Sequence, residues 1–433
     1  MPAPTLASRT EGGTSAFQRW FPVLPFFAYW IGTLLLFEFG PLVNDPLHAE
    51  TYVYLLTGLA CFAAAYAAGL AGRRWLRPVQ TLREAALAYA WLRWTAPAAL
   101  IGAAGLVLDR LLSGAGSFSR TLTETQYVRE EFGWNTTWIT TLSVAPYCLS
   151  LVSLAAYFVS EKHRRLPGYI HAMIIAQVAL LAYNAFLSAN RGVFFWLLTY
   201  WLFHLFFVRG FGVRTFLTAR ALRVPRLAFI AVLAVSLSYI YFIARYRSSE
   251  MYLTYLVSTE GTSLRYSLPD IDTPALGALI SLMQYGTHEY GFIDAFLERA
   301  DPVAFNPGYL LGSRVLDQVR RVVPGYETQG EIVAGRWISD AGLAPWAWPS
   351  VFGWLLALFG YLGAPLFLAG LGFTYGRLAR EYLWSGSFGS LVIVFSLYTA
   401  LNMSFNWIGG DLQQNTGYLV GLGLLLWRRQ VPR

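Results

Sequence analysis

The chain has 433 residues, of which 56% are hydrophobic, 17% are aromatic and only 13% are charged. Soluble domains carry about 25% charged residues, so this composition excludes an ordinary soluble protein. Apolar runs of about 20 residues, the length that crosses a bilayer as a helix, recur along the sequence. Closed barrels alternate apolar and polar residues instead, so these solid runs predict an all-α, polytopic membrane bundle.

The apolar runs predict about ten transmembrane helices. The first run begins at Phe21 and is interpreted as a membrane anchor, because no small-residue cleavage pattern follows it. Residues 78–94 have helical periodicity with arginines and tryptophans, which indicates an interfacial helix before the third span. Cys61 and Cys148 lie inside apolar runs and are interpreted as packing residues. In chain order, the predicted helices cover residues 21–40, 51–72, 95–112, 138–159, 169–188, 193–208, 227–244, 348–375, 388–406 and 412–427.

The net charge of +8 comes almost entirely from arginine, in short clusters between the apolar runs. If the N-terminus is cytoplasmic, every one of these clusters falls on the cytoplasmic side, as the positive-inside rule requires. Both termini are then cytoplasmic. The charge reflects membrane topology, and no nucleic-acid partner is expected. The clusters are residues 73–77, 161–165, 209–226 and 376–380 and the C-terminal WRRQVPR.

The same alternation of sides places one very long connection, residues 245–346, outside the membrane. Roughly a hundred residues without a spanning run are too many for a plain connector, and loops of this length usually carry function. Stretches such as GFIDAFLERA have apolar residues at helical spacing, which predicts short amphipathic helices against the outer face. The chain therefore divides into an N-terminal bundle of about seven spans (1–244), this external loop (245–346) and C-terminal helices (347–433).

Several arginines are expected on the outer side, against the charge rule, and three of them lie at the ends of predicted spans. Arg191 lies in the tight turn SANRG between two apolar runs, and Arg245 and Arg247 follow the seventh span in FIARYRSSEMY. A guanidinium group presents a planar fork that suits phosphate, so these residues are candidate ligands of a diphosphate. The alternative for Arg191 is a side chain that reaches back to the membrane interface.

The stretch QYGTHEYGF, residues 284–292, combines His288 and Glu289 with Tyr285 and Tyr290. A histidine exchanges a proton near neutral pH, and a carboxylate with a raised pKa accepts one from a sugar hydroxyl. Both are candidate catalytic bases, and the tyrosines are candidate contacts for a sugar substrate. The alternative is an ordinary solvated loop pair, because a His-Glu dipeptide alone has low specificity.

A second group of candidate residues precedes the eighth span, in NPGYLLGSRVLDQVRRVVPGYETQGEIVAGRWISDAGLAPWAW. Glu331 and Asp340 are further candidate bases, and Arg314 and Arg336 are further candidate diphosphate ligands. Motifs of soluble enzymes, such as a P-loop, a dinucleotide fingerprint, an HExxH metal site or a nucleophile elbow, are absent from the sequence. An ATP-driven pump is therefore not expected.

The layout resembles the Wzy-type polymerases that join the repeat units of O-antigens. Three stretches carry the resemblance: SANRGVFFWLL at a tight outward turn, NPGYLLGSRVLDQVRRVVPGYE in the external loop, and WISDAGLAPWAWPSVFGWLLALFGYLG at the entry to a glycine-rich helix. It covers about the last 250 residues; the first half matches only in being spans. O-antigen ligases share the architecture, but HEYGFIDAFLERA does not reproduce the glycines that follow their loop histidine.

The resemblance implies an enzyme of the bacterial inner membrane with its large loop in the periplasm. Such an enzyme moves a glycan from one polyprenyl-diphosphate carrier to the terminal sugar of another, without a metal or cofactor. The implied partners are the lipid-linked donor and acceptor, membrane lipid and a membrane protein that sets chain length. Arginines would stabilise the leaving diphosphate, and a carboxylate or histidine would take the proton of the acceptor hydroxyl.

Two other functional classes stay open. A transporter or flippase of lipid-linked oligosaccharide predicts ionisable residues inside the spans, for which Asp109, Arg110 and His204 are the candidates. A non-catalytic scaffold of polysaccharide assembly would tolerate the loss of the loop's charges. The external loop has no role in a transporter, so the polymerase is the favoured prediction and a ligase-like glycosyltransferase is its enzymatic alternative.

Overall fold

The protein is described here by a computed structural model of residues 1–433. The structure describes residues 14–40, 42–43, 46–72, 81–112, 138–187, 192–218, 350–402 and 412–430, with short stretches between residues 227 and 298. These residues are helical except for turns and one two-stranded contact. In this contact β1 (Leu42–Val43) pairs antiparallel with β2 (Ser263–Leu264), with Leu42 opposite Leu264.

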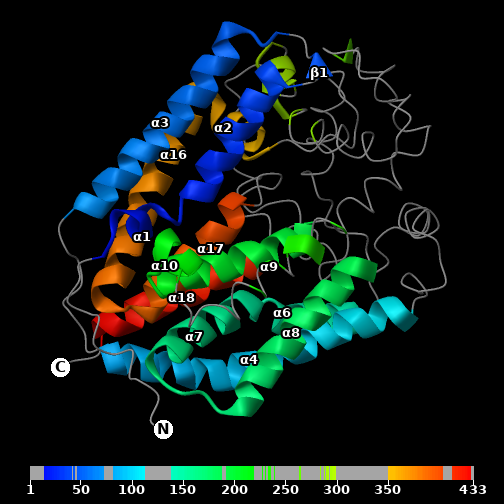
Figure 1. Ribbon diagram of the computed structural model, residues 1–433, viewed down its shortest axis with the longest axis vertical. Helices are drawn as coiled ribbons and strands as arrows, with labels where there is room; N and C mark the ends of the chain where they lie inside the picture. Colours follow the sequence, from blue (N-terminus) through cyan, green and yellow to red (C-terminus); the bar gives the residue numbers. More distant parts are fainter. Residues whose placement is uncertain are drawn as a thin grey trace, which may run out of the picture.

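The prediction of a helical bundle is confirmed for the described residues (Figure 1). Most helices are long and apolar, and the π-helix η2 continues α9 directly. The helices are α1 (Ala16–Trp20), α2 (Leu24–Phe39), α3 (Ala49–Ala71), α4 (Thr81–Leu112), α6 (Trp138–Tyr147), α7 (Ser150–His163), α8 (Gly168–Leu187), α9 (Gly192–Leu202), η2 (Phe203–Val208), α10 (Val213–Thr218), α16 (Val351–Ser385), α17 (Phe388–Asn402) and α18 (Leu412–Gln430).

Among the described residues, four helical stretches are long and apolar enough to cross a membrane: Ala49–Ala71, Leu82–Leu112, Trp138–His163 and Leu358–Ser385. Shorter apolar helices accompany them, including α2 and α17. The total of about ten spans stays a prediction. The predicted domain limits at residues 244 and 346 lie outside the described residues.

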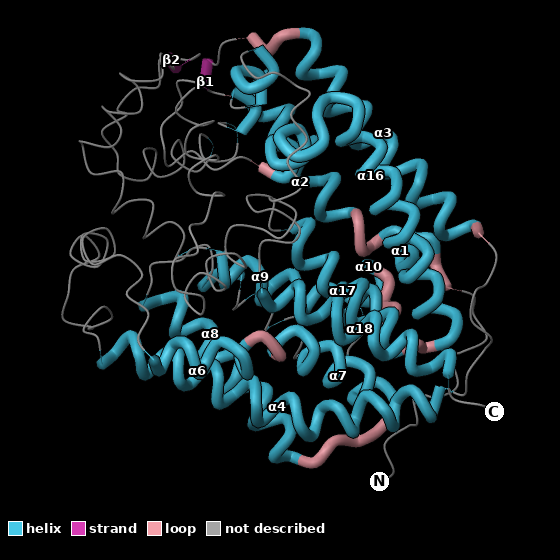
Figure 2. Tube along the Cα trace, turned by 180° about the vertical axis from the view of Figure 1, so that it is seen from behind, coloured by secondary structure: helices cyan, strands magenta, loops and turns pink. Residues whose placement is uncertain are grey.

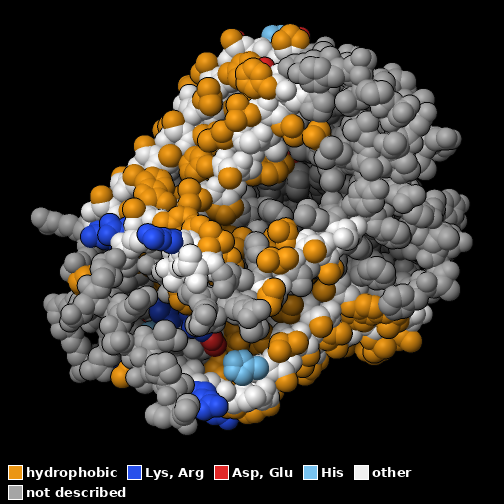
Figure 3. All heavy atoms as spheres, in the orientation of Figure 1, with side chains coloured by type: hydrophobic (Ala, Val, Ile, Leu, Met, Phe, Trp, Pro, Cys, Tyr) orange, Lys and Arg blue, Asp and Glu red, His pale blue; other side chains and the backbone are white. Residues whose placement is uncertain are grey.

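Large apolar side chains form exposed stripes along these long helices. On α4, Trp94 (81% exposed), Ile101 and Leu108 recur every seven residues and therefore lie on one face. Leu362 and Leu366 form a similar exposed face on α16. Figure 3 shows hydrophobic side chains spread widely over the helices on this face of the molecule, whereas lysine and arginine gather at one end. Such continuous apolar surfaces suit lipid chains rather than water.

The helices form two arms joined by α17, as the views in Figures 1 and 2 show from opposite sides. In one arm α3 packs along α16, with α2 beside them; in the other, α4 packs against α6, α7 and α8. Helix α17 contacts α16, α18 and α7, and nearly all of its residues are buried. It is the central element of the bundle.

Glycines allow α3 and α16 to lie unusually close together. The two helices run parallel, since Tyr54 Oη donates to the carbonyl of Phe352 near their starts and Gly69 meets Arg377 near their ends. A Cβ atom on Gly376 would lie 2.2 Å from the carbonyl oxygen of Tyr66. Small residues four apart, as in the GFTYG stretch of α16, give membrane helices this kind of backbone approach.

Two of the predicted helix limits near prolines differ from those in the structure. The interfacial helix predicted at 78–94 and the span predicted at 95–112 form one helix, α4, which continues through Pro97. The span predicted at 138–159 is instead interrupted between α6 and α7, just after Pro146. Membrane helices tolerate proline where neighbouring groups take up the freed hydrogen-bonding partners, so local sequence does not decide the outcome.

Helix α16 extends ten residues past the predicted limit of 375 and is broken near its start. Gly360 has φ 69° and ψ −178° inside it, which separates a first short helix from the long stretch that follows. An L-residue with a side chain rarely adopts this backbone conformation, so the break depends on glycine. Most of the helix predicted at 227–244 lies outside the described residues.

Candidate functional site

Two of the predicted site residues, Glu289 and Tyr290, are described by the structure, and they lie together in one helical stretch. The others lie outside the described residues, so their roles stay predictions. These are His288, Tyr285, Arg191, Arg245, Arg247, Arg314, Glu331, Arg336 and Asp340.

Residues 289–291 and 293–298 are helical and are named here the docked segment. Tyr290, Ile293 and Phe296 recur every three residues and so share one helix face. All three are buried and belong to the main hydrophobic core. The segment therefore packs onto the bundle through an amphipathic face. It lies where α2 ends and α3 begins, which is named the His48 end of the molecule.

Tyr290 fixes the docked segment to α2. Its hydroxyl donates to the carbonyl oxygen of Trp30 at 2.7 Å and lies 2.8 Å from Oγ1 of Thr33. Its ring makes edge contacts with Trp30 and Phe37, with centroids 5.7 Å and 5.6 Å away. A buried tyrosine needs a partner for its hydroxyl, and here that requirement specifies the register of the segment on α2.

Glu289 is a buried carboxyl group with few polar neighbours. Glu289 is 1% exposed, and its Oε1 accepts a long hydrogen bond of 3.4 Å from the hydroxyl of Tyr29. Oε2 is buried and has no hydrogen-bond partner among the described residues. Burial raises the pKa of this carboxyl well above its usual range, and the hydrogen bond from Tyr29 lowers it only in part. Burial in this conformation thus favours the neutral, protonated form of Glu289.

Asp294 ties the docked segment to the start of α3. Its Oδ1 accepts a hydrogen bond of 2.9 Å from the backbone N–H of His48 and another from the hydroxyl of Thr51. Its Oδ2 lies 2.9 Å from Nδ1 of His48, an ion pair when that ring is protonated. The hydrogen bond and the negative charge of Asp294 raise the pKa of His48, and Glu298 and Glu50 raise it further.

The described residues of the His48 end are mainly acidic. Besides Asp294, it carries Glu38, whose carboxylate accepts a hydrogen bond from Tyr52 and so links α2 to α3. Glu50 and Glu298 lie near enough to act on His48. The site therefore combines a neutral carboxyl, aromatic rings and surrounding negative charge, an environment suited to proton exchange with a hydroxyl group.

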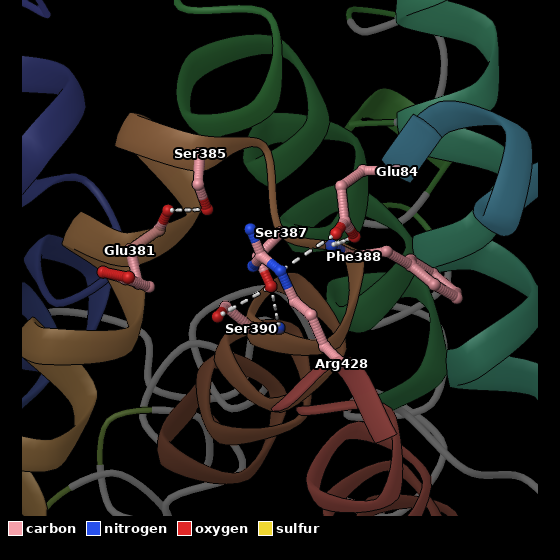
Figure 4. A network of polar contacts seen from close by, with 7 residues as sticks. All are labelled: Glu84, Glu381, Ser385, Ser387, Phe388, Ser390 and Arg428. Atoms are coloured by element: carbon pink, nitrogen blue, oxygen red, sulfur yellow. Dashed lines mark hydrogen bonds and ion pairs between the residues drawn. The ribbon is translucent and has the colours of Figure 1, made fainter. Parts of the chain in front are cut away.

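A second polar cluster occupies the opposite end, named the Arg428 end (Figure 4). Glu84 of α4 accepts a hydrogen bond from the backbone N–H of Phe388 at 2.9 Å and pairs with Nε of Arg428 at 3.3 Å. Ser387 caps α17 by accepting a hydrogen bond from the N–H of Ser390. Both carboxylate oxygens of Glu84 are thus used to fasten the ends of three helices together. These contacts are structural.

A third polar cluster lies where α7 meets η2. Arg209 forms an ion pair with Glu161, and Nε2 of His204 lies 3.2 Å from the other oxygen of that carboxylate. The imidazole of His204 stacks on Phe158 with ring centroids 4.5 Å apart. π-Helices often occur at functional sites. Here Glu161 joins η2 to α7 through Arg209 and His204, while Nδ1 of His204 is buried and has no hydrogen-bond partner among the described residues.

Of the residues considered for transport, Asp109 and His204 take part in different clusters. Asp109 is buried near the end of α4 and accepts a hydrogen bond from Thr140 of α6, whereas His204 belongs to the cluster with Glu161. Cys61 and Cys148 are free thiols. Among the described residues, no three His, Cys, Asp or Glu side chains are grouped so that they could hold a metal ion.

Sequence reasoning missed Asp294, His48 and Thr51. The available signal was weak: Asp294 is one of two acids in GFIDAFLERA, four residues after Tyr290, and its partners are more than 240 residues away. Comparisons with known protein families, curated proteins and solved structures find no match to this chain. The function is therefore argued from the site alone.

Proposed function

We propose that this chain is a membrane glycosyltransferase that polymerises polyprenyl-diphosphate-linked oligosaccharides, as the Wzy-type polymerases do. The polymer grows on the outer face of the inner membrane of a bacterium, where the long connection 245–346 lies. Four long apolar helices and exposed apolar stripes support the membrane part of the proposal. Substrates anchored by lipid tails arrive at a fixed depth, which reduces the entropic barrier to their reaction.

The buried carboxyl of Glu289 is the observation that carries the proposal. It is one of the candidate bases predicted from the sequence. Its carboxyl contacts the hydroxyl of Tyr29, whose ring packs on Trp30, and Trp30 in turn packs on Tyr290. A carboxylate with a raised pKa binds a proton more strongly than an ordinary one, so it is a better base toward a sugar hydroxyl near neutral pH.

In the proposed reaction the acceptor hydroxyl oxygen attacks the anomeric carbon of the donor. The bond from that carbon to the diphosphate oxygen breaks, and its electron pair leaves with the polyprenyl diphosphate. Glu289 first releases its own proton to the medium and then, as a carboxylate, takes the hydroxyl proton, while Arg191, Arg245 and Arg247 stabilise the departing charge. Oε2 of Glu289 is covered in the described conformation, so the docked segment has to move from α2 before a sugar reaches this atom.

The proposal is tested with purified protein in liposomes that contain a polyprenyl-diphosphate oligosaccharide, without added nucleotide. We expect a ladder of products with increasing numbers of repeat units. Glu289→Gln keeps the shape and neutrality of the side chain but removes the base, and we expect it to abolish the ladder. Glu298→Gln, at an exposed position of the same segment, is the matched control and should leave the ladder intact. Normal product lengths with Glu289→Gln would exclude Glu289 as the base.

A second candidate function, transport of a lipid-linked oligosaccharide, is favoured by the break in α16. Discontinuous helices form the substrate sites of many transporters, and Gly360 interrupts α16 near the His48 end. A transporter would move a fluorescent lipid-linked oligosaccharide between leaflets without changing its size. Gly360→Ala, which forces a side chain into a disfavoured backbone conformation, should then abolish this movement. A product ladder in the same liposomes favours the polymerase.

A further inference from the structure

Two of the contacts that join the docked segment to the bundle each depend on a proton. One is the clamp between Asp294 and His48, and the other is the covered carboxyl of Glu289. We propose that the docked segment is a pH-sensitive latch, closed in an acidic medium at the His48 end and opened as the pH rises, which uncovers Glu289. The latch itself follows from these contacts, and its effect on glycan transfer rests on the proposed function.

The clamp geometry favours a charged His48. Nδ1 of the ring and the backbone N–H of the same residue reach the two oxygens of one carboxylate, each at 2.9 Å. A protonated ring adds a charge-assisted hydrogen bond to Asp294, whereas a neutral ring keeps at most an ordinary one. Because His48 is mostly exposed, its proton exchanges freely with the medium.

The buried position of Glu289 against α2 requires a neutral carboxyl. Tyr29 supplies one long hydrogen bond, and Oε2 has no partner in the described part of the chain. An ionised carboxylate in this position would be a buried charge without compensation, which is strongly unfavourable. Deprotonation of Glu289 therefore favours a position in which water reaches the carboxylate, and the segment that carries it has to leave α2.

Several charged or titratable groups lie around both contacts. Glu50 on α3 and Glu298 on the segment face His48 and favour its protonated form. On α2 and α3, the pair of Glu38 and Tyr52 lies beside Asp294. Tyr290 is the titratable neighbour of Glu289 on the segment, and its own hydroxyl is occupied by α2.

Both contacts weaken in the same direction of pH. Docking raises the pKa of His48, so the clamp is complete below the ordinary histidine pKa and is lost as the pH rises through the raised value. Docking also raises the pKa of Glu289, so its contribution is complete below the ordinary glutamate pKa and declines above it until the raised value is passed. Each unit of pKa difference between the docked and released segment changes the docking equilibrium about tenfold.

The test is hydrogen–deuterium exchange of the full chain in lipid nanodiscs between pH 5 and 8, corrected for intrinsic exchange rates. We expect the protection of peptides that cover residues 289–298 to fall roughly tenfold or more over this range, while peptides of α3 and α17 keep theirs. His48→Asn retains a side-chain donor near the Nδ1 position but cannot titrate, and Glu289→Gln retains a neutral carboxamide. Each should remove part of the pH dependence, and the double variant should remove it entirely.

Two results would overturn the latch: pH-independent protection of the segment in the unmodified protein, or an undiminished pH dependence in the double variant. His171→Asn is the matched control, because His171 contacts Tyr157 in the other arm of the bundle and should not affect the segment. The exchange measurement needs no substrate. A missing product ladder with a working latch therefore contradicts only the proposed function, and a ladder with pH-independent exchange contradicts only the latch.

Discussion

Removal of one hydroxyl group, in Tyr290→Phe, tests whether the docked segment is held as the contacts indicate. The hydroxyl proton goes to the carbonyl oxygen of Trp30 at 2.7 Å. Thr33 has a single hydroxyl proton, which it shares between the carbonyl of Tyr29 at 2.7 Å and Tyr290 at 2.8 Å. The variant therefore loses one complete hydrogen bond and part of a second, while the ring contacts with Trp30 and Phe37 remain.

A buried hydrogen bond contributes about 0.5–1.5 kcal/mol net, so we expect Tyr290→Phe to weaken docking by about 1–2 kcal/mol. This corresponds to roughly a five- to thirtyfold loss of exchange protection for residues 289–298 at pH 5.5. Tyr361→Phe is the matched control, because the hydroxyl of Tyr361 donates to the backbone carbonyl oxygen of Glu50 at 3.3 Å in an exposed position. Unchanged protection in Tyr290→Phe, or an equal loss in Tyr361→Phe, would refute the assignment of Tyr290 as an anchor.

Three further predictions concern the bundle and are checked by thermal unfolding in detergent. Gly376→Ala should destabilise the protein by about 1–3 kcal/mol, the usual cost of overpacking, because its Cβ would lie 2.2 Å from a backbone oxygen. Gly370→Ala, with open space around its Cβ, should be neutral or slightly stabilising. Equal effects would contradict the close approach of α3 and α16. Glu84→Ala should cost about 3 kcal/mol by stranding a buried arginine, and adding Arg428→Met should recover part of the loss; no recovery would show that their ion pair is unimportant. Ser387→Ala should cost about 1 kcal/mol through loss of the α17 cap, and an unchanged melting temperature would argue against that cap.

The helical class of the fold could be predicted from composition and apolar run length, since both are local properties of the sequence. Helix limits were predicted well where glycine or charge ends a run, as for α8 and α18. Near Pro97 the predicted limit between residues 94 and 95 falls inside α4, and near Pro146 the predicted span consists of two helices, α6 and α7, because the effect of a proline in a membrane helix depends on neighbouring helices. The break at Gly360 likewise depends on packing that a single sequence does not reveal.

The candidate site could be predicted only in part. Glu289 and Tyr290 stand out because acids and paired tyrosines are conspicuous in an apolar chain. Asp294 does not, since its importance comes from His48 and Thr51, which the fold brings to it from the other end of the sequence. Contacts of such long sequence separation are set by tertiary packing, and helical periodicity carries no information about them.

The most direct test of the account is turnover by the purified protein in liposomes that hold a polyprenyl-diphosphate oligosaccharide as both donor and acceptor. The account predicts a ladder of lengthened lipid-linked products without added nucleotide, lost in Glu289→Gln and retained in Glu298→Gln. Movement of the labelled substrate between leaflets with no change in its length would contradict the account and identify a transporter instead.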